Sequence, residues 1–293
     1  MWNWHTRRFE PMRSFYIIAN SEKDENLKLS YEIADYLESR GMYCTIRRKD
    51  EEGARSYERL KEAEVEGILV LGGDGTLLRA ARELAWLKIP FLGINLGHLG
   101  YLAEIERQNV QTALDRLIAD EYTVEERMML TGSVLVNGRE TGRDVALNDI
   151  VLYRQGNLKV VDYDIYVNDE YLYSSTADGI IVSTPTGSTG YSLSAGGPIV
   201  SPEASILVLT PICSHTLNSR SIVFSGDERI RVGIGEGRHG GVDESCVTFD
   251  GDSCFRLRSG DYVEIRRAAE VTRIIKINQV SFLEVLREKL SRS

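Results

Sequence analysis

The residue best placed to do chemistry is an aspartate set among glycines. Residues 71–76 read LGGDGT and directly follow the apolar run 68–71, so Asp74 lies where a buried strand should end. Asp-Gly pairs are among the commonest turn signals, and one interpretation is a plain turn in which Asp74 caps the following helix. The other interpretation is a functional site.

The glycines around Asp74 suit a phosphate. A strand that ends in Gly-Gly-x-Gly and leads into a helix leaves backbone N–H groups free to bind an anion, with the helix dipole behind them. No lysine follows at P-loop spacing, and the motif is not GxGxxG. An acid among phosphates repels them unless it coordinates a bridging metal or accepts a proton from the hydroxyl being phosphorylated. On this motif alone, the turn and the site both remain open.

A second polar segment favours the site. Residues 174–202 read SSTADGIIVSTPTGSTGYSLSAGGPIVSP, in which an apolar strand at 180–182 leads into a run dominated by Ser, Thr and Gly. Such a run is too polar for a core strand, and it offers hydroxyl and backbone donors to a polyhydroxylated or heterocyclic ligand. Tyr191 could lie against a flat base. A surface loop is the weaker interpretation, because Asp178-Gly179 and Gly196-Gly197-Pro198 fix both ends.

The elements that must position these residues change character along the chain. From residue 14 to about residue 121, short apolar runs alternate with segments of helical spacing, which predicts a doubly wound α/β domain with a parallel sheet. After about residue 126, alternating strands are joined by tight turns at Asn137-Gly138, Asn168-Asp169 and Asp250-Gly251. This pattern predicts a mostly antiparallel β-sandwich.

The expected organisation is therefore two domains in contact. Residues 1–12 form an N-terminal extension, residues 13–125 the α/β nucleotide-binding domain, and residues 126–277 the β-sandwich. An apolar face on the C-terminal segment 278–293 predicts a helix that returns to the first domain.

Bulk composition excludes several classes of protein. No apolar stretch is long enough to cross a bilayer, and the N-terminus has no signal-peptide h-region. The four cysteines show no CxxC pair or zinc spacing, which indicates a reduced, cytoplasmic setting. A net charge of -9 argues against binding to nucleic acid or anionic lipid.

The chain resembles the ATP-dependent NAD kinases over residues 15–267. The resemblance rests on LGGDGT, the downstream Asn148-Asp149 pair and TADGIIVSTPTGSTGYSLSAGGPIV, together with GINLGHLGYL at 93–102 and TFDG at 248–251. GGDGT alone is shared with lipid kinases and, with a Ser ending, with phosphofructokinases, so the long Ser/Thr/Gly motif is the specific part. These kinases phosphorylate NAD at the 2′-hydroxyl of the adenosine ribose and so make NADP.

The resemblance implies a role for each matching residue. Asp74 would be the general base facing the ribose 2′-hydroxyl, and Tyr191 would stack on the adenine. The ATP phosphates would be held by Gly72, Gly73, Gly75 and Thr76. The NAD contacts would be Asp74, Gly75, Asn148, Asp149, Asp178, Thr186, Thr189, Gly190, Tyr191, Ser192, Leu193 and Ser194, with weaker NAD or ATP matches at Arg79, Lys159, Thr176, Cys213 and Asp252.

The resemblance also implies the partners. ATP would be the donor, accompanied by Mg²⁺ or another divalent ion bridged by ATP near Asp74, and the sequence shows no fixed set of protein ligands for that ion. The chain would bind NAD and ATP as a homodimer or homotetramer, without nucleic acid or membrane. Two alternatives stay open: a GGDGT-type lipid kinase, which needs an apolar slot for acyl chains, and a non-catalytic dinucleotide-binding regulator.

Overall fold

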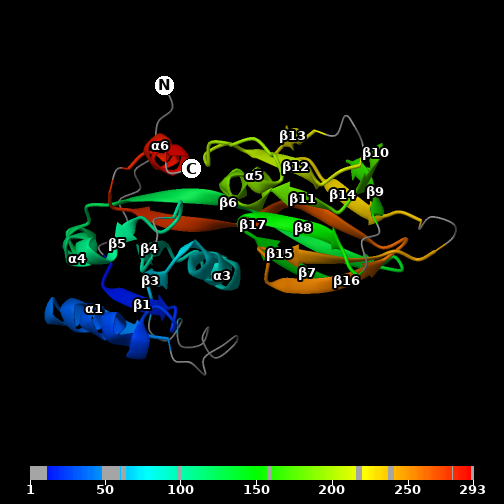
Figure 1. The fold of residues 1–293 in the computed structure, drawn as a ribbon. Helices are drawn as coiled ribbons and strands as arrows, with labels where there is room; N and C mark the ends of the chain where they lie inside the picture. The colour runs from blue at the N-terminus through cyan, green and yellow to red at the C-terminus, as the bar shows by residue number, and fades with distance from the viewer. Residues whose placement is uncertain are drawn as a thin grey trace. The chain divides into compact units, whose positions relative to one another are not determined.

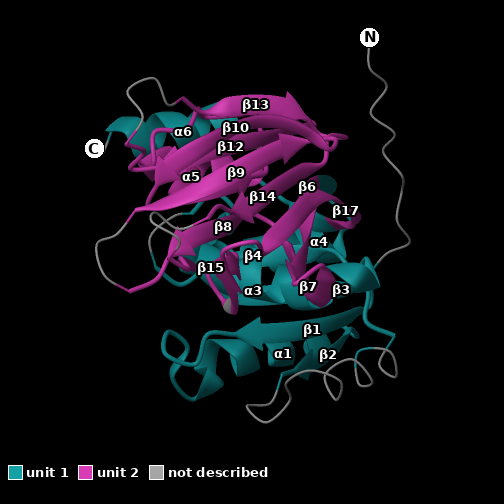
Figure 2. Cartoon of the chain, turned by 90° about the vertical axis from the view of Figure 1, so that its right-hand side faces the viewer, with its two compact units in different colours: residues 1–126, 272–293 teal, residues 127–271 magenta. Residues whose placement is uncertain are grey.

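The computed structural model describes residues 12–47, 60, 64–97, 100–156, 160–215, 220–236, 241–278 and 280–291. The chain divides into two compact units (Figure 2): unit 1 comprises residues 1–126 and 272–293, and unit 2 comprises residues 127–271. Two long strands, β6 (Thr123–Val136) and β17 (Tyr262–Lys276), run from one unit into the other.

Unit 1 contains a parallel sheet and the helices that cover it (Figure 1). Its strands run in the order β2-β1-β3-β4, with β5 and the end of β17 also pairing with β4. The elements are β1 (Ser14–Ala19), α1 (Lys28–Ser39), β2 (Tyr43–Ile46), β3 (Gly67–Gly72), α3 (Asp74–Leu84), β4 (Phe91–Asn95), β5 (Ile105–Glu106), α4 (Val110–Ile118) and α6 (Phe282–Ser291), with short 3-10 turns at Glu25–Leu27, Ala85–Leu87 and Arg107–Asn109.

Helices lie on both faces of this sheet. Leu69 and Leu71 of β3 share a buried cluster with the apolar faces of α1 and α4. On the opposite face, Leu77 of α3 packs so closely on Gly93 of β4 that a Cβ there would stand 3.0 Å from it. Every residue of β3 is buried, as a parallel strand covered on both sides requires. The predicted doubly wound α/β fold is confirmed.

Unit 2 is built from two antiparallel sheets. One has the order β10-β9-β14-β17, with β6 pairing β17 and β7; the other has the order β13-β12-β11-β8-β15-β16. Besides β6 and β17, its elements are β7 (Arg139–Ala146), β8 (Asp149–Arg154), β9 (Val161–Val167), β10 (Glu170–Ala177), β11 (Gly179–Ser183), η4 (Thr186–Thr189), α5 (Tyr191–Ser194), β12 (Ile206–Ile212), β13 (Ile222–Ser225), β14 (Ile230–Ile234), β15 (Glu244–Phe249) and β16 (Ser253–Arg258).

Alternate residues of both sheets meet in one core. Ile150 and Leu152 of β8 share a buried cluster with Ile165 of β9 and Val232 of β14, which places an apolar layer between the two sheets. Asn137, Asn168 and Asp250 adopt the positive φ angles of two-residue hairpin turns, at the positions that the sequence predicts. The mostly antiparallel β-sandwich is thereby confirmed.

Two boundaries differ from the expected ones. Unit 2 ends at residue 271 rather than 277, because β17 continues unbroken until Ile274 pairs with Phe91 of β4. Met12 is buried in the core of unit 1, and the rest of the expected N-terminal extension lies outside the described residues. Helix α6 belongs to unit 1, where the Phe282 ring lies 6.4 Å from that of Tyr101.

Candidate functional site

The GGDGT segment of unit 1 forms the junction between β3 and α3. Gly72 is the last residue of the strand, Gly73 is the N-cap, and Asp74 opens the helix. A Cβ at Gly72 would overlap the Thr76 hydroxyl, whereas one at Gly75 would meet open space within 4 Å. The start of α3, with the positive end of the helix dipole, therefore has open space beside Gly75. Such a helix N-terminus suits a phosphate.

The Asp74 carboxylate is held by a neighbouring backbone segment. Oδ2 accepts a hydrogen bond from the Tyr101 N–H at 2.7 Å, and Oδ1 accepts bonds from the N–H groups of Leu102 and Ala103, both at 3.1 Å. A Cβ at Gly100 would overlap the carboxylate. The end of GINLGHLGYL, Tyr101 and Leu102, thus fixes Asp74 together with Ala103, and a glycine at residue 100 is required for the approach.

This arrangement bears on the two sequence interpretations of Asp74. Gly73 and not Asp74 is the N-cap of α3, and the Asp74 carboxylate accepts hydrogen bonds from residues 101–103 instead of from the first turn of the helix, which argues against the helix-cap interpretation. The two carboxylate oxygens offer about four acceptor positions, and the three backbone N–H groups occupy three of them. Among the residues that the structure describes, one position on Oδ2 is left for a further donor such as a hydroxyl.

A basic residue beside the loop was not found from the sequence. The Lys23 Nζ lies 3.5 Å from the position that a Cβ of Gly73 would take and 3.3 Å from that of Gly97. Lys23 follows β1 in the segment NSEKDEN, which carries no phosphate-loop signature. Arg79, the basic residue that the sequence did select, is exposed on α3.

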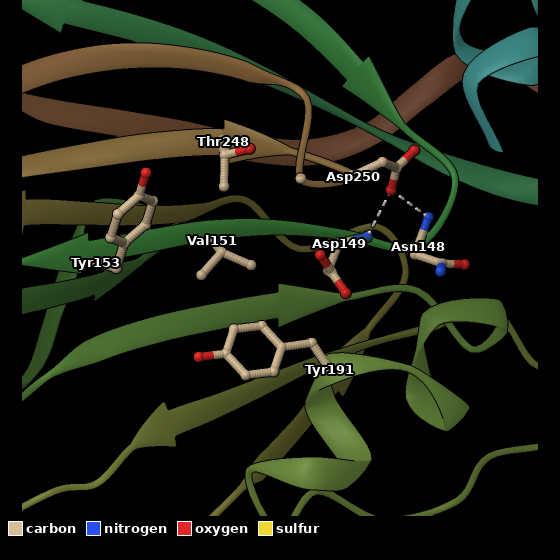
Figure 3. A pocket seen from close by; sticks show the side chains of 8 residues that line it. Asn148, Asp149, Val151, Tyr153, Tyr191, Thr248 and Asp250 are labelled. Carbon is tan, nitrogen blue, oxygen red and sulfur yellow. Dashed lines mark hydrogen bonds between the residues drawn. The ribbon is translucent and has the colours of Figure 1, made fainter. Parts of the chain in front are cut away.

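Unit 2 contains a pocket of about 450 Å³ on the outer face of the six-stranded sheet (Figure 3). Val151 and Tyr153 of β8 point into it because their neighbours Ile150 and Leu152 point into the core. Tyr191 of α5 faces the strands across the pocket. The pocket is lined by Asn148, Asp149, Val151, Tyr153, Tyr191, Thr248, Asp250 and Gly251.

One lining residue holds the Asn148-Asp149 pair in place. The Asp250 carboxylate accepts hydrogen bonds from the N–H groups of Leu147, Asn148 and Asp149, at 2.8, 2.8 and 3.1 Å; Figure 3 shows the last two. Asp250 lies at the hairpin turn between β15 and β16, where its φ of 50° is accommodated by the tight turn. Asp250 of TFDG therefore positions the backbone of the Asn148-Asp149 pair, which lies 101–102 residues earlier.

The carboxyl group of Asp149 has a raised pKa. Only 6 % of the residue is exposed, and burial is the main reason that its pKa is raised from 3.8 to about 7. The negative charge of Asp250 contributes further in the same direction. A carboxyl group poised near neutrality in a pocket can donate or accept a hydrogen bond to a sugar hydroxyl according to its protonation state.

The Ser/Thr/Gly segment packs against the backbone at Asn148. Thr184 donates its hydroxyl to the Leu147 carbonyl at 2.6 Å and its N–H to the Asn148 carbonyl at 2.8 Å. Gly187 lies so close to the Asn148 backbone that a Cβ would overlap it. Thr186 is 7 % exposed, and its Oγ1 has no hydrogen-bond partner among the described residues. A buried orphan hydroxyl is what a ligand donor or acceptor would satisfy.

Other residues selected from this segment differ in exposure. Tyr191 is 48 % exposed, and Leu193 and Ser194 are also exposed on α5. Ser192 is fully buried, and its hydroxyl lies 3.2 Å from that of Thr210 on β12, so this side chain fixes α5 to the sheet. Thr189 donates to the Thr186 carbonyl at 3.3 Å, and Gly190 is the N-cap of α5.

Two of the more distant candidates, Cys213 and Asp178, act electrostatically on the Tyr191 hydroxyl. Burial first, and then the charges of Cys213, Asp149 and Asp178, raise the pKa of Tyr191. Asp178 forms an ion pair with Arg154 at 2.7 Å.

The remaining weaker candidates are structurally diverse. Thr176 donates its hydroxyl to Asp162, Asp252 is exposed beside the hairpin turn, and Lys159 lies outside the described residues. No group of three or more His, Cys, Asp or Glu side chains in the described ranges could hold a metal ion. The described helices include none with the length and apolarity needed to span a membrane.

Comparisons with known proteins agree over both units. Residues 15–122 match the ATP-NAD kinase N-terminal domain, and residues 147–277 match the ATP-NAD kinase C-terminal domain. The chain is 48% identical to an NAD kinase of Agathobacter rectalis over 282 residues, covering 95% of this chain and 99% of the relative. It is 42% identical to an NAD kinase of Lachnospira eligens, covering 95% of this chain and all of the relative.

Two solved structures share the fold. One is yeast NADH kinase complexed with NADH, which has a TM-score of 0.82, 23% identity and coverage of 96% of this chain and 88% of the other. The second is an NAD kinase from Archaeoglobus fulgidus in complex with ATP, with a TM-score of 0.76, 24% identity and coverage of 95% of this chain and 99% of the other.

Proposed function

The chain belongs to the ATP-NAD kinase family, and from this premise we infer that it transfers the γ-phosphate of ATP to NAD⁺ to make NADP⁺. The acceptor is the 2′-hydroxyl of the adenosine ribose. The observation that carries this proposal is Asp74, a carboxylate fixed by three backbone N–H groups at the start of α3, with one acceptor position on Oδ2 that no described residue fills.

The phosphate loop binds the donor. The backbone N–H groups of Gly73, Asp74 and Gly75 together with the α3 dipole compensate phosphate charge, and a divalent ion bound to ATP would add to this compensation. The Lys23 ammonium beside Gly73 and Gly97 adds a positive charge at the same surface. These fixed donors need no reorganisation when the phosphoryl group transfers.

Asp74 orients the acceptor hydroxyl and takes its proton. A carboxylate is a weak base toward a sugar hydroxyl, so the proton moves late, once the forming P–O bond has made the hydroxyl more acidic. Holding Asp74 rigidly is therefore as important as its basicity, because in-line alignment dominates phosphoryl transfer.

The pocket of unit 2 holds NAD. Asn148 and Asp149 hydrogen-bond ribose hydroxyls, and the exposed Tyr191 ring stacks on the adenine. The Thr186 hydroxyl lies outside the pocket lining, and we propose that it too gains a partner when NAD binds. We further propose that Asp178, Thr189, Gly190, Leu193 and Ser194 complete this surface. Ser192 contributes through its backbone, because its hydroxyl is buried against Thr210.

A coupled assay tests the reaction. The purified chain, supplied with Mg²⁺ and ATP, should convert NAD⁺ to NADP⁺, detected by an NADP-specific dehydrogenase. Diacylglycerol should not stimulate ATP consumption, because both units of the chain match the ATP-NAD kinase family. ATP consumption with the lipid and not with NAD⁺ would instead establish the lipid kinase, and NAD binding without turnover would establish a regulator.

We also propose that the chain forms a homodimer or homotetramer in the cytoplasm. The resemblance to NAD kinases supports this proposal. Free thiols at all four cysteines are consistent with a reducing compartment. Light scattering coupled to size-exclusion chromatography measures the assembly directly.

A further inference from the structure

Two cysteines lie together on the outer face of the six-stranded sheet. In the register of β15 and β16, Cys246 opposes Arg256 and Cys254 opposes Thr248, so the cysteines are diagonal neighbours on one face. Their Sγ atoms are 2.6 Å apart. Diagonal cross-strand pairs lie at about the longest Cα separation that a disulfide spans, so bonding the two sulfurs also requires the strands to move slightly.

This face also carries the pocket. Cys246 opposes Tyr153 of β8, and Thr248, two residues farther along β15, opposes Val151. Tyr153, Thr248 and Val151 all line the pocket. The Tyr153 hydroxyl lies 4.0 Å from the Cys254 Sγ, so the cysteine pair directly adjoins a pocket wall.

The two thiols differ in access. Cys254 is exposed, whereas Cys246 is fully buried and burial raises its pKa to about 11. The Gln155 amide donates a hydrogen bond to the Cys246 Sγ at 2.7 Å, which stabilises negative charge on that sulfur when its proton leaves. An oxidant therefore meets Cys254 first, and Cys246 is the internal thiol placed to resolve the product.

We propose that Cys246 and Cys254 form an oxidative modification site whose disulfide form weakens NAD binding in the adjoining pocket. Hydrogen peroxide transfers one oxygen atom to the Cys254 thiol and gives a sulfenic acid and, from the other oxygen, water. Cys246 attacks that sulfur, loses its proton and forms the S–S bond, with release of a second water. The thiol pair is oxidised by two electrons and the peroxide is reduced by two.

The expected effect follows from what the hairpin carries. The segment between Cys246 and Cys254 contains Thr248 at the end of β15 and Asp250 and Gly251 in the turn, all of which line the pocket. Asp250 also fixes the backbone of Asn148 and Asp149. Drawing the two sulfurs together shifts β16 against β15 at the base of this turn. The part of the proposal that names NAD as the ligand rests on the proposed function.

The test compares reduced and peroxide-treated protein by intact mass, peptide mapping and calorimetric titration with NAD⁺. Treatment should remove two hydrogen atoms, link the peptides of Cys246 and Cys254, and raise the NAD dissociation constant about threefold to tenfold, with recovery after dithiothreitol. Absence of the linked peptide, or a linked peptide with an unchanged dissociation constant, overturns the proposal.

Matched variants separate this pair from other thiols. Cys254→Ser should bind NAD⁺ like the untreated parent and lose the response to peroxide, whereas Cys44→Ser should keep the full response. A response that persists in Cys254→Ser would assign the effect to another residue and refute the proposal. Because binding is read without turnover, a chain that binds NAD⁺ but makes no NADP⁺ would contradict the proposed function and still decide this one.

Discussion

At the residue scale, Asp74 and Asp250 are held by the same device. Each carboxylate accepts hydrogen bonds from three consecutive backbone N–H groups, 101–103 for Asp74 and 147–149 for Asp250. In the first case the backbone fixes the acid, and in the second the acid fixes the backbone. A carboxylate suits both because it is an acceptor only, with two oxygens to share among the donors.

Asp74→Asn should keep NAD binding and lose turnover by about three orders of magnitude or more, because an amide cannot accept the ribose proton. Its NH₂ group also faces one of the backbone N–H donors, so the variant should be less stable by about 1–3 kcal/mol. Single-turnover assays and NAD titration measure the two effects, and chemical denaturation at matched pH gives the stability. Near-normal turnover would remove Asp74 from the catalytic role.

The raised pKa of Asp149 should make the free energy of unfolding depend on pH. Its folded pKa of about 7 lies above the unfolded value of about 4, so the folded state binds more protons between these values. The contribution of Asp149 to the unfolding free energy is fully present below pH 4 and is lost as the pH rises to about 7 and beyond.

Asp149→Asn should therefore flatten the stability profile between about pH 4 and pH 7, as measured by urea unfolding of ligand-free protein. Asp227→Asn, at an exposed turn residue of unit 2, is the matched control and should keep the parent profile. Parallel profiles for the parent and Asp149→Asn would show that Asp149 titrates normally.

At the element scale, the β15–β16 turn and the segment at residues 100–103 each hold site residues that belong to other elements. The turn of β15 and β16 supplies Asp250 to the start of β8. Asp250→Asn removes one acceptor oxygen and leaves a backbone N–H of residues 147–149 unsatisfied, which costs about 1–3 kcal/mol.

The expected kinetic result for Asp250→Asn is a rise of about tenfold in the KM for NAD⁺, with the KM for ATP unchanged, because the pocket of unit 2 loses its fixed Asn148-Asp149 backbone. Asp227→Asn again serves as the control. Equal effects on both KM values would indicate general unfolding instead of local positioning, and circular dichroism would check the fold.

Gly100 makes a second prediction at this scale. Its Cβ position overlaps the Asp74 carboxylate, so Gly100→Ala should displace Asp74 and reduce kcat by about tenfold or more without touching a substrate. Gly233→Ala on β14, where the nearest atom would lie 3.7 Å away, should be nearly neutral. Steady-state kinetics of both variants test the assignment, and an unaffected Gly100→Ala would show that the loop can yield.

At the scale of the whole molecule, charge decides how phosphates can be bound. The chain carries 44 acidic against 35 basic residues, and its ligands add further negative charge. No described cluster of acidic, His or Cys side chains can hold a metal by itself. We expect the divalent ion to arrive with the nucleotide, and local donors such as Lys23 to assist in compensating the phosphate charge.

Metal dependence should therefore follow ATP. EDTA should abolish NADP⁺ formation and Mg²⁺ should restore it, while Mg²⁺ without ATP should leave the melting temperature unchanged and Mg²⁺ with ATP should raise it. Differential scanning calorimetry separates these cases. A clear stabilisation by Mg²⁺ alone would demonstrate a dedicated metal site in the protein.

The sequence by itself determined what is local. Hairpin turns at Asn137-Gly138, Asn168-Asp169 and Asp250-Gly251 follow from residues that tolerate positive φ, and the alternation of apolar runs with helical spacing gave the doubly wound α/β unit. The glycines of GGDGT likewise indicated the junction between β3 and α3. The family motifs predicted Asn148, Asp149 and Tyr191 as site residues, and in the structure all three line one pocket.

Only the tertiary structure decided which distant groups meet. The N–H groups that hold Asp74 lie 27–29 residues away, and those that Asp250 holds lie 101–103 residues away, where no periodicity or composition can register them. The same is true of Lys23 beside Gly97, of the burial of Ser192, and of the side-chain approach of Cys246 to Cys254. Backbone turns are encoded by neighbouring residues, whereas these contacts depend on the packing of strands that only the folded chain brings together.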